Sequence, residues 1–502
     1  MNHLTDLLTN LQHGFSLLMG VGPMVTIAAG VIFGILVGAM PGLSPAMGVA
    51  LLVPFTYGMP AELAIILLVS VYLAADYGGS ITAVTINAPG TPSAAATALD
   101  GYQLTLQGKP GYGLGVSLVA STVGGLIGTV VLILFSIPLA RLAVKCHPAE
   151  YFAIAVFGLT CVSAFGRGNA AKAFVATLFG LLLETIGIDF ISGVRRFTFG
   201  IEQLEYGISL VPALIGLFAL SEVFLQIEQG SLDTPVAAVS QTAWPSWVEY
   251  WRLRSTIIVS SLVGTIIGVF PGAGATIASF IAYDTARRMS RQPERFGQGS
   301  LEGVAASEAA NSSSVGGALV PLLTLGIPGS ASTAVLIGAL MIHKVDPNPR
   351  LVSTQPDLVY GLFASLFVAN AMLLLFGLFG SRLWVRVTAI PKPWLFPLIV
   401  AVSVIGSYAV QNAYIDVASC LVFGLIGWAM RRAGFPVAPV VLGIVLGGIA
   451  EKSFRQAVLM GGYDVFVTRP ASLAILLVAT LSFALPLWRA ARSRVKASSP
   501  RA

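Results

Sequence analysis

GILVGAMPG, residues 34–42, returns further along the chain as GTIIGVFPG, residues 264–272. Both copies carry two glycines and a closing Pro-Gly pair at the same spacing. A second pair follows in the same order: GGSITAVTINAPGTPSAAATAL, which begins at Gly78, resembles GGALVPLLTLGIPGSASTAVLIGAL, which begins at Gly316, with one extra residue in the second copy. One such match has little weight in a glycine-rich chain, but two in the same order predict an internal duplication.

The duplication predicts how the chain is organised. We expect a first transmembrane repeat over residues 1–228, a second over 255–465, and a polar linker over 229–254 between them. The linker contains Pro, Ser, Trp and charged residues, which are typical of a loop with interfacial anchors. Residues 466–502 are expected to form a last transmembrane helix and a basic tail.

The composition is that of a membrane protein. Of 502 residues, 56% are hydrophobic and only 10% are charged, with a mean hydropathy of +0.86, whereas soluble domains have roughly a quarter charged residues. Uncharged runs such as 7–61 and 309–343 exceed the roughly 20 residues that cross a bilayer. We therefore expect an all-α polytopic protein in a lipid bilayer, with on the order of ten to fourteen membrane segments.

Basic residues indicate the orientation of the chain. The tail WRAARSRVKASSPRA has no acidic residue, so the positive-inside rule predicts a cytoplasmic C-terminus. This explains the basic residues without nucleic-acid binding, and we expect no nucleic-acid partner. The loop at 283–297 is rich in arginine, whereas its repeat counterpart at 54–63 has one acid and no base. Opposite charge bias in equivalent loops predicts two inverted-topology repeats with broken transmembrane helices and helical hairpins.

Pro-Gly pairs predict the breaks in these helices. Four of them, at 41–42, 89–90, 271–272 and 328–329, belong to the duplicated segments, two in each half. Proline removes a backbone donor and glycine favours irregular backbone, which a bilayer tolerates only inside protein or beside a polar cavity. Small and hydroxylated residues follow the second break of each half and predict helix starts, whose free N–H groups and positive dipole end suit a carboxylate.

The predicted site lies between the two hairpins. The substrate-binding candidates are Asn87, Gly90, Thr91, Ser93, Asn311, Gly329, Ser330, Ser332 and Thr333. The coupling-ion candidates, in or beside the first break of each half, are Gly42, Ser44, Gly272 and Thr276. Alternatively, the Pro-Gly pairs only kink helices and the small residues only allow close packing. Their duplication in corresponding positions favours a transporter binding site.

Two acidic residues interrupt the apolar runs, Asp76 before the first hairpin and Glu308 before the second. Ionisable groups inside membrane segments are functional candidates. The alternative is that both lie at helix ends in the interface.

Other classes of function find little support. The three cysteines and four histidines show no metal-ligand spacing, and neither a Walker A sequence nor a GxSxG or HExxH motif is present. We therefore expect no cofactor other than a sodium ion or proton as coupling ion. The competing hypotheses are a membrane enzyme that uses Asp76, Glu308 or His343, and a passive channel.

Four segments carry a family resemblance: PGLSPAMGVALLVPFTYG (41–58), YGGSITAVTINAPGTPSAAATALDGY (77–102), FPGAGATIASFIAY (270–283) and EAANSSSVGGALVPLLTLGIPGSASTAVLIGAL (308–340). They resemble the large membrane subunit of the tripartite tricarboxylate transporter family. The family's version of one stretch reads EAANNAAAGG, so Ser312 to Ser314, and also Asp76, are expected to be particular to this chain's subgroup, where they either tune the substrate or have no role.

The resemblance implies a multi-pass permease of the bacterial cell inner membrane. Its partners would be a small membrane subunit and a periplasmic solute-binding protein. Its substrate would be a tricarboxylate, a dicarboxylate or an aromatic acid, imported with a sodium or proton gradient. The family's functional motifs fall on residues 87–97 and 326–333 of this chain.

Overall fold

The computed structural model describes residues 3–40, 42–164, 170–189, 191–230, 244–387, 392–482 and 484. This part of the chain is almost entirely helical; its one sheet joins β1 (Gly187–Ile188) and β2 (Arg195–Arg196) in antiparallel register. The all-α prediction is confirmed. The basic tail, Pro41 and half of the predicted linker, residues 231–243, lie outside the described residues.

The chain forms two compact units, and each contains residues from both predicted repeats. Unit 1 comprises residues 1–140, 210–269 and 274–428, and unit 2 comprises 141–209, 270–273 and 429–502. The helices that lie wholly or mainly in unit 1 are α1 (His3–Leu17), α2 (Val21–Gly38), α3 (Pro45–Leu52), α4 (Ala61–Ile86), α5 (Ala94–Leu106), α6 (Pro110–Ala143), α9 (Leu210–Ile215), α10 (Ser221–Glu228), α11 (Trp247–Arg252), α12 (Arg254–Val269), α13 (Gly274–Met289), α14 (Leu301–Leu325), α15 (Ala331–Ile342), α16 (Leu351–Thr354), α17 (Pro356–Val387), α18 (Lys392–Gln411) and α19 (Tyr414–Arg432).

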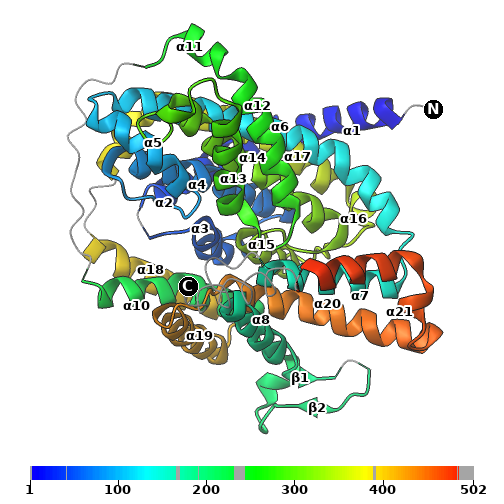
Figure 1. Ribbon diagram of the computed structural model, residues 1–502. Coiled ribbons are helices and arrows are strands. Elements are labelled where there is room, and N and C mark those ends of the chain that lie inside the picture. The colour runs from blue at the N-terminus through cyan, green and yellow to red at the C-terminus, as the bar shows by residue number, and fades with distance from the viewer. Residues whose placement is uncertain are drawn as a thin grey trace, which may run out of the picture. The chain divides into compact units, whose positions relative to one another are not determined.

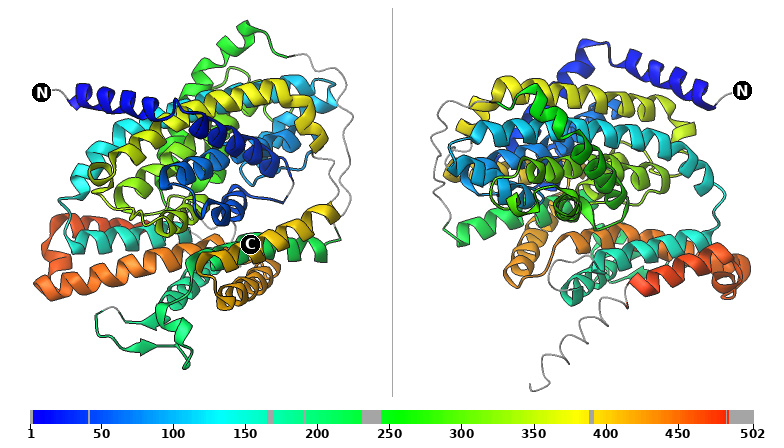
Figure 2. Two further views of the ribbon diagram at one scale, coloured as in Figure 1. Left: turned by 180° about the vertical axis from the view of Figure 1, so that it is seen from behind. Right: turned by 45° about the horizontal axis from the view of Figure 1, so that its top comes forward.

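Many of these helices have the length and apolarity of membrane spans. Within the described residues six helices are long and apolar enough to cross a bilayer, and six further apolar helices are shorter. The six long ones are Val21–Gly38, Ala61–Ile86, Pro110–Ala143, Leu210–Glu228, Pro356–Gly380 and Tyr414–Arg432. The most buried of them is α4, at the centre of unit 1 (Figure 1). Figure 2 shows α1 projecting from unit 1 beside α17, against which it packs.

Glycines bring α2 and α4 into backbone contact. A Cβ at Gly34 would lie 2.6 Å from the carbonyl oxygen of Val71, and one at Gly38 would overlap that of Ala75. No side chain fits at such positions without moving a helix, so these glycines set the helix separation.

The same contact recurs between α12 and α14. A Cβ at Gly264 would overlap the carbonyl oxygen of Ala310, and one at Gly268 would lie 2.5 Å from that of Ser314. These four residues stand in the same relation as Gly34, Val71, Gly38 and Ala75 in the first half. The duplication seen in the sequence is therefore also a duplication of packing; the opposite orientation of the two copies across a membrane stays a prediction.

Packing corrects the alignment of the second motif by one residue. Gly78 lies against Gly38, and its counterpart against Gly268 is Gly317, not Gly316. Two adjacent glycines in each copy made the other alignment look natural, but only this one matches the helix contacts. It removes the extra residue and places Asn87 opposite Gly326.

Unit 2 is a smaller helical layer with a β-hairpin. Its helices are α7 (Pro148–Ala164), α8 (Ala170–Glu184), α20 (Ala438–Gly461) and α21 (Val465–Thr468), and α20 packs against both α7 and α8. The hairpin of β1 and β2 lies beyond the C-terminal end of α8 (Figure 1). A further apolar helix, Pro470–Ser482, corresponds to the predicted last transmembrane helix.

Candidate functional site

Each hairpin turn begins with a residue in the left-handed conformation. Asn87, at φ 56°, ends α4, and Gly326, at φ 70°, ends α14. The next amide in each half bonds back into the helix: Ala88 N–H donates to Thr82 O at 3.3 Å and Ile327 N–H donates to Pro321 O at 3.2 Å. This is the usual way to end a helix, so the break precedes each Pro-Gly pair. The side chain of Asn87 is exposed.

The two turn glycines have a packing role. Gly90 N–H donates to Gly79 O at 3.1 Å, and a Cβ at Gly90 would overlap Gly38 O. A Cβ at Gly329 would lie 2.7 Å from Gly268 O. Each turn thus packs directly on a glycine of the helix contact in its own half, Gly38 or Gly268. This explains why no larger residue fits at Gly90 or Gly329.

The hydroxyl groups after the turns are arranged differently in the two halves. Ser330 caps α15: its hydroxyl accepts the N–H of Thr333 at 3.2 Å, and Thr333 Oγ1 accepts the N–H of Ser330 at 2.8 Å. By contrast, Ser93 makes no side-chain cap to α5, and its hydroxyl lies 3.0 Å from that of Thr91. Both first-half hydroxyls are buried, as is Ser332.

Two hydrogen bonds bring predicted site residues of the second half to α4. Tyr72 and Ser330 share a hydrogen bond of 3.0 Å between their hydroxyls. One turn further along α4, the carbonyl oxygen of Asp76 accepts a bond of 3.0 Å from Asn311 Nδ2. Asn311 and Ser330 therefore contact α4 directly, and Thr333 is bonded to Ser330.

The coupling-ion candidates lie in the first turns of α3 and α13 or in the turns that precede these helices. Ser44 is the cap of α3 and accepts the N–H of Met47 at 3.2 Å. Gly42, at φ 95°, contacts Gln226 of α10. Gly272 belongs to unit 2, whereas Thr276, in the first turn of α13, belongs to unit 1.

Asp76 and Glu308 lie within helices, not at their ends. Their exposed fractions are 2% and 0%, so the alternative that they lie at helix ends is wrong. Glu308 is held by hydroxyls of two other helices: Thr97 of α5 donates to Oε1, and Ser121 of α6 donates to Oε2 at 2.8 Å.

Further hydroxyls surround this carboxyl group. Thr97 and Ser307 share a bond of 3.0 Å, and Ser80 and Ser117 share one of 2.5 Å. Thr97 is the last residue of the predicted motif 87–97, but sequence reasoning missed Ser117 and Ser121, because isolated serines in an apolar run carry no signal of their own.

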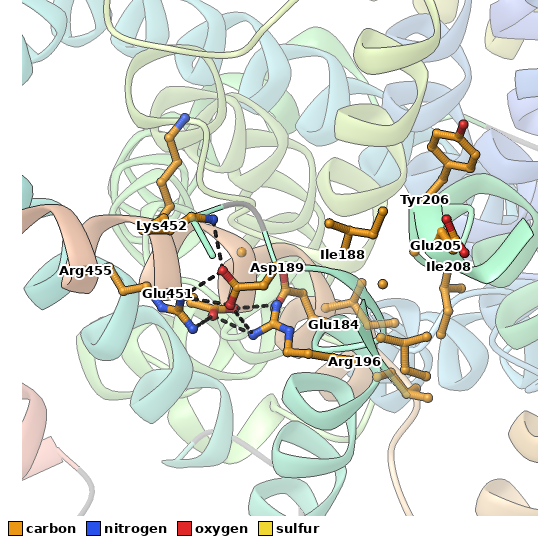
Figure 3. A pocket seen from close by; sticks show the side chains of 17 residues that line it. Glu184, Ile188, Asp189, Arg196, Glu205, Tyr206, Ile208, Glu451, Lys452 and Arg455 are labelled. Atoms are coloured by element: carbon orange, nitrogen blue, oxygen red, sulfur yellow. Dashed lines mark hydrogen bonds and ion pairs between the residues drawn. The ribbon is translucent and has the colours of Figure 1, made fainter. Parts of the chain in front are cut away.

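Unit 2 contains a separate charged cavity of about 490 Å³, between the β-hairpin and α20 (Figure 3). Arg455 reaches Asp189 at 2.8 Å and Glu451 at 2.6 Å, and Arg196 reaches Glu451 at 2.7 Å. Hydrogen bonds from Ser192 and from Arg455 hold the pKa of the Asp189 carboxyl below its usual range. Because these charges neutralise one another, the cluster braces the hairpin; sequence reasoning missed it, since its members are far apart in the chain.

Several helices are long and apolar enough to cross a membrane, and one packing pattern around a broken helix occurs twice. Polar side chains are buried between these helices. Together these features define a polytopic membrane protein with an interior polar site. The chain belongs to the tripartite tricarboxylate transporter TctA family, whose pattern matches residues 24–442. The resemblance seen in the sequence is thus confirmed, and the chain is a component of a transport system.

Two relatives are both from Agrobacterium vitis. An "Uncharacterized 52.8 kDa protein in TAR-I ttuC' 3'region" is 36% identical over 97% of this chain and 98% of its own length. An "Uncharacterized protein in TAR-II ttuC' 3'region" is 38% identical over 46% of this chain and 98% of its own length. No solved structure matches the chain.

Proposed function

We propose that this chain is the permease subunit of a binding-protein-dependent secondary transporter that imports a carboxylate across the bacterial inner membrane. The substrate is a tricarboxylate, a dicarboxylate or an aromatic acid. A periplasmic solute-binding protein delivers it, a small membrane subunit completes the complex, and a sodium or proton gradient drives uptake. Family membership supports the transport function.

One observation carries the location of the substrate site: the two hairpin turns occupy equivalent places on equivalent helix pairs. Asn87 and Gly326 end their helices in the same conformation, and Gly90 and Gly329 press on Gly38 and Gly268. Paired broken helices of this kind hold the substrate in other secondary transporters. The alternative that the breaks are simple kinks does not account for a helix that restarts after each turn.

The first hairpin offers the better donors for a carboxylate. The hydroxyls of Thr91 and Ser93 bond to each other, and because only one can donate in that pair, at least one hydroxyl proton stays free for an acceptor. The adjacent α5 has 13 residues, and its N-terminal dipole favours an anion. In the second hairpin Ser330 already bonds to Thr333 and Tyr72, so it positions α15 and contacts substrate less directly.

Both hydroxyls of the first hairpin are buried, so substrate reaches them only after a rearrangement. That requirement suits alternating access, in which one bundle moves against another around a fixed site. It argues against a passive channel, whose pathway stays open.

Uptake by proteoliposomes tests the proposal. The chain is reconstituted with its small subunit and supplied with the binding protein and a radiolabelled carboxylate. We expect uptake that needs the binding protein, collapses when the ion gradients are dissipated and does not need ATP. Gradient-independent equilibration without the binding protein would favour a channel, and chemical conversion of the substrate would favour an enzyme.

A point variant tests the site within the same assay. Ser93→Ala should weaken the apparent affinity about ten- to a hundredfold, because it removes one hydrogen bond to a charged group. The control is Ser365→Ala, a buried serine of α17 whose hydroxyl donates only to Leu362 O, at 2.8 Å. Equal affinities for the two variants would exclude the first hairpin.

A further inference from the structure

A continuous seam of polar side chains crosses the apolar interior of unit 1. On α4 it comprises Tyr72, Asp76 and Ser80, which are spaced four apart and so share one helix face. On α14 it comprises Glu308, Asn311 and Ser312, which also share one face. All six are at most 2% exposed, and the Asn311 to Asp76 hydrogen bond joins the two faces.

The centre of this seam has acceptor oxygens that no donor satisfies. Asp76 Oδ2 and Asn311 Oδ1 have no hydrogen-bond partner among the described residues, although both residues are buried and are bonded to each other through other atoms. Ser312, the next residue on α14, has an unpartnered hydroxyl as well. Burying an acceptor oxygen that has no donor costs free energy of folding. A cation bound between two such oxygens would satisfy both.

Among the side chains that the structure describes, no basic one pairs with Asp76 or Glu308. The helices α2, α3 and α15, which pack against α4, have no charged residue or histidine. The titratable residues of the other helices packed against α4 are Asp100 and Tyr102 on α5, Glu302 and Glu308 on α14, and Asp357, Tyr360, Arg382 and Arg386 on α17.

Glu308 is the member of that set that acts electrostatically on Asp76. It is an acid, so it adds to the need for positive charge. On α4 itself the titratable neighbours are Tyr72 and Tyr77, which are neutral when protonated.

We propose that Asp76, with Asn311, is the binding site of the coupling cation. The ligand is a monovalent cation that oxygen can hold, either a sodium ion or a proton, bound to the Asp76 carboxylate and steadied by the Asn311 amide oxygen. This inference rests on the proposed function and gives its ion a site. It is an alternative to the prediction from the sequence, which placed the ion at Gly42, Ser44, Gly272 and Thr276.

The seam also explains how a cation here would be coupled to the hairpins. Tyr72, one turn before Asp76, bonds to Ser330 at the start of α15. Glu308, one turn before Asn311, bonds to Thr97 of α5. Asp76 is thus linked to α15 through Tyr72 and to α5 through Asn311 and Glu308, so a change of its charge can affect both hairpin helices.

Glu308 is the weaker candidate for the cation itself. Each of its carboxyl oxygens already accepts a hydroxyl proton, from Thr97 and from Ser121. We assign it a positioning role, in which it ties α5 and α6 to α14.

The direct test measures cation binding without substrate or partners. The melting temperature of the purified chain in detergent is followed while sodium chloride replaces potassium chloride at constant pH, and separately while pH is lowered at constant salt. A ligand that binds the folded state raises the melting temperature. We expect the wild type to respond in one arm, which identifies the ion, and Asp76→Asn to lose that response.

Two further variants keep the test decisive. Asn311→Ala should move the midpoint of the same response about tenfold toward weaker binding, even if Asp76→Asn fails to fold. Asn370→Ala is the matched control, since Asn370 is a buried amide of α17 that also has an unpartnered Oδ1. Its response should equal that of the wild type.

Three results would overturn the inference: a wild type that responds in neither arm, an Asp76→Asn variant that responds like the wild type, or an Asn311→Ala midpoint equal to that of Asn370→Ala. Its failure is separable from failure of the proposed function. Wild-type proteoliposomes that accumulate a carboxylate while Asp76→Asn keeps the cation response would refute only the cation site. Absence of carboxylate uptake by the wild-type complex would refute the function.

Discussion

Asp100, the only acidic residue of α5, holds the loop that leads into α14, and replacing it should release that loop. Its Oδ1 accepts the N–H groups of Gly297, Gly299 and Ser300, each at 2.8 Å. Its Oδ2 accepts the hydroxyl of Tyr283 at 2.8 Å. Asp100→Ala removes all four bonds and leaves three amides without their partner.

The magnitude follows from these contacts. A hydrogen bond to a charged group contributes roughly 1.5 to 3 kcal/mol when buried. Gly297 is exposed, so water replaces part of each lost bond. Asp100→Ala should therefore lower the free energy of opening the loop by about 1 kcal/mol for each amide, or about 3 kcal/mol in all. The open loop should then be about a hundredfold more populated. Asp100→Asn keeps an acceptor oxygen and should fall between Asp100→Ala and the wild type.

Limited trypsin digestion measures this population, because the loop contains Arg291 and Arg295 and cleavage follows the open fraction when opening is fast. The control is Asp284→Ala, which removes an exposed ion pair of 2.6 Å with Arg288 near the same loop and should cost under about 1 kcal/mol. If Asp100→Ala were cleaved no faster than Asp284→Ala, the carboxylate would not hold the loop.

Three further predictions concern packing, topology and pH. Gly329→Ala should cost about 1 to 3 kcal/mol through overpacking and lower the melting temperature, whereas Gly361→Ala, whose nearest neighbour would be 4.0 Å away, should not; equal melting temperatures would count against the glycine contact. Single cysteines at Tyr57 and Ser290, in a background without the native cysteines, should react with an impermeant reagent from opposite sides of the membrane, and labelling from one side would remove the inverted repeat. Folding lowers the pKa of Asp189, so its contribution to stability is present above the unfolded value of about 3.9 and is lost as the pH falls below it; Asp189→Asn should flatten the acid side of the melting-temperature profile, and an unchanged profile would contradict this.

The sequence predicted the helix breaks well because their signal is local. A left-handed cap and a Pro-Gly pair lie within a few residues of each other, as at Asn87 and Gly90. It predicted less well what the glycines do, since their role depends on a distant helix. Gly124 shows this: it lies in an apolar run outside both motifs, yet a Cβ there would overlap the backbone of α14 at Ala309.

Long-range pairs were beyond the sequence altogether. Asp76 and Asn311 were both recognisable as polar residues in apolar surroundings, but nothing in the chain indicated that one bonds to the other. The ion pairs of Asp189 and Arg455 were missed for the same reason. Periodicity and turn chemistry describe neighbours along the chain, whereas these contacts depend on which helices pack together.

The glycine contacts have a mechanical consequence. Helices that touch backbone to backbone, as α12 and α14 do at Gly264 and Gly268, are interlocked and cannot slide without lifting apart. Gly128 of α6 makes the same kind of backbone contact with α14, at Ser313 and Gly316. Hydroxyl pairs such as Thr97 and Ser307 do not resist sliding in this way, because a hydroxyl group can rotate toward a new partner after a small shift of the helix. Motion during a transport cycle should therefore run along the hydroxyl-lined surfaces, with the glycine-bound helices moving as rigid blocks.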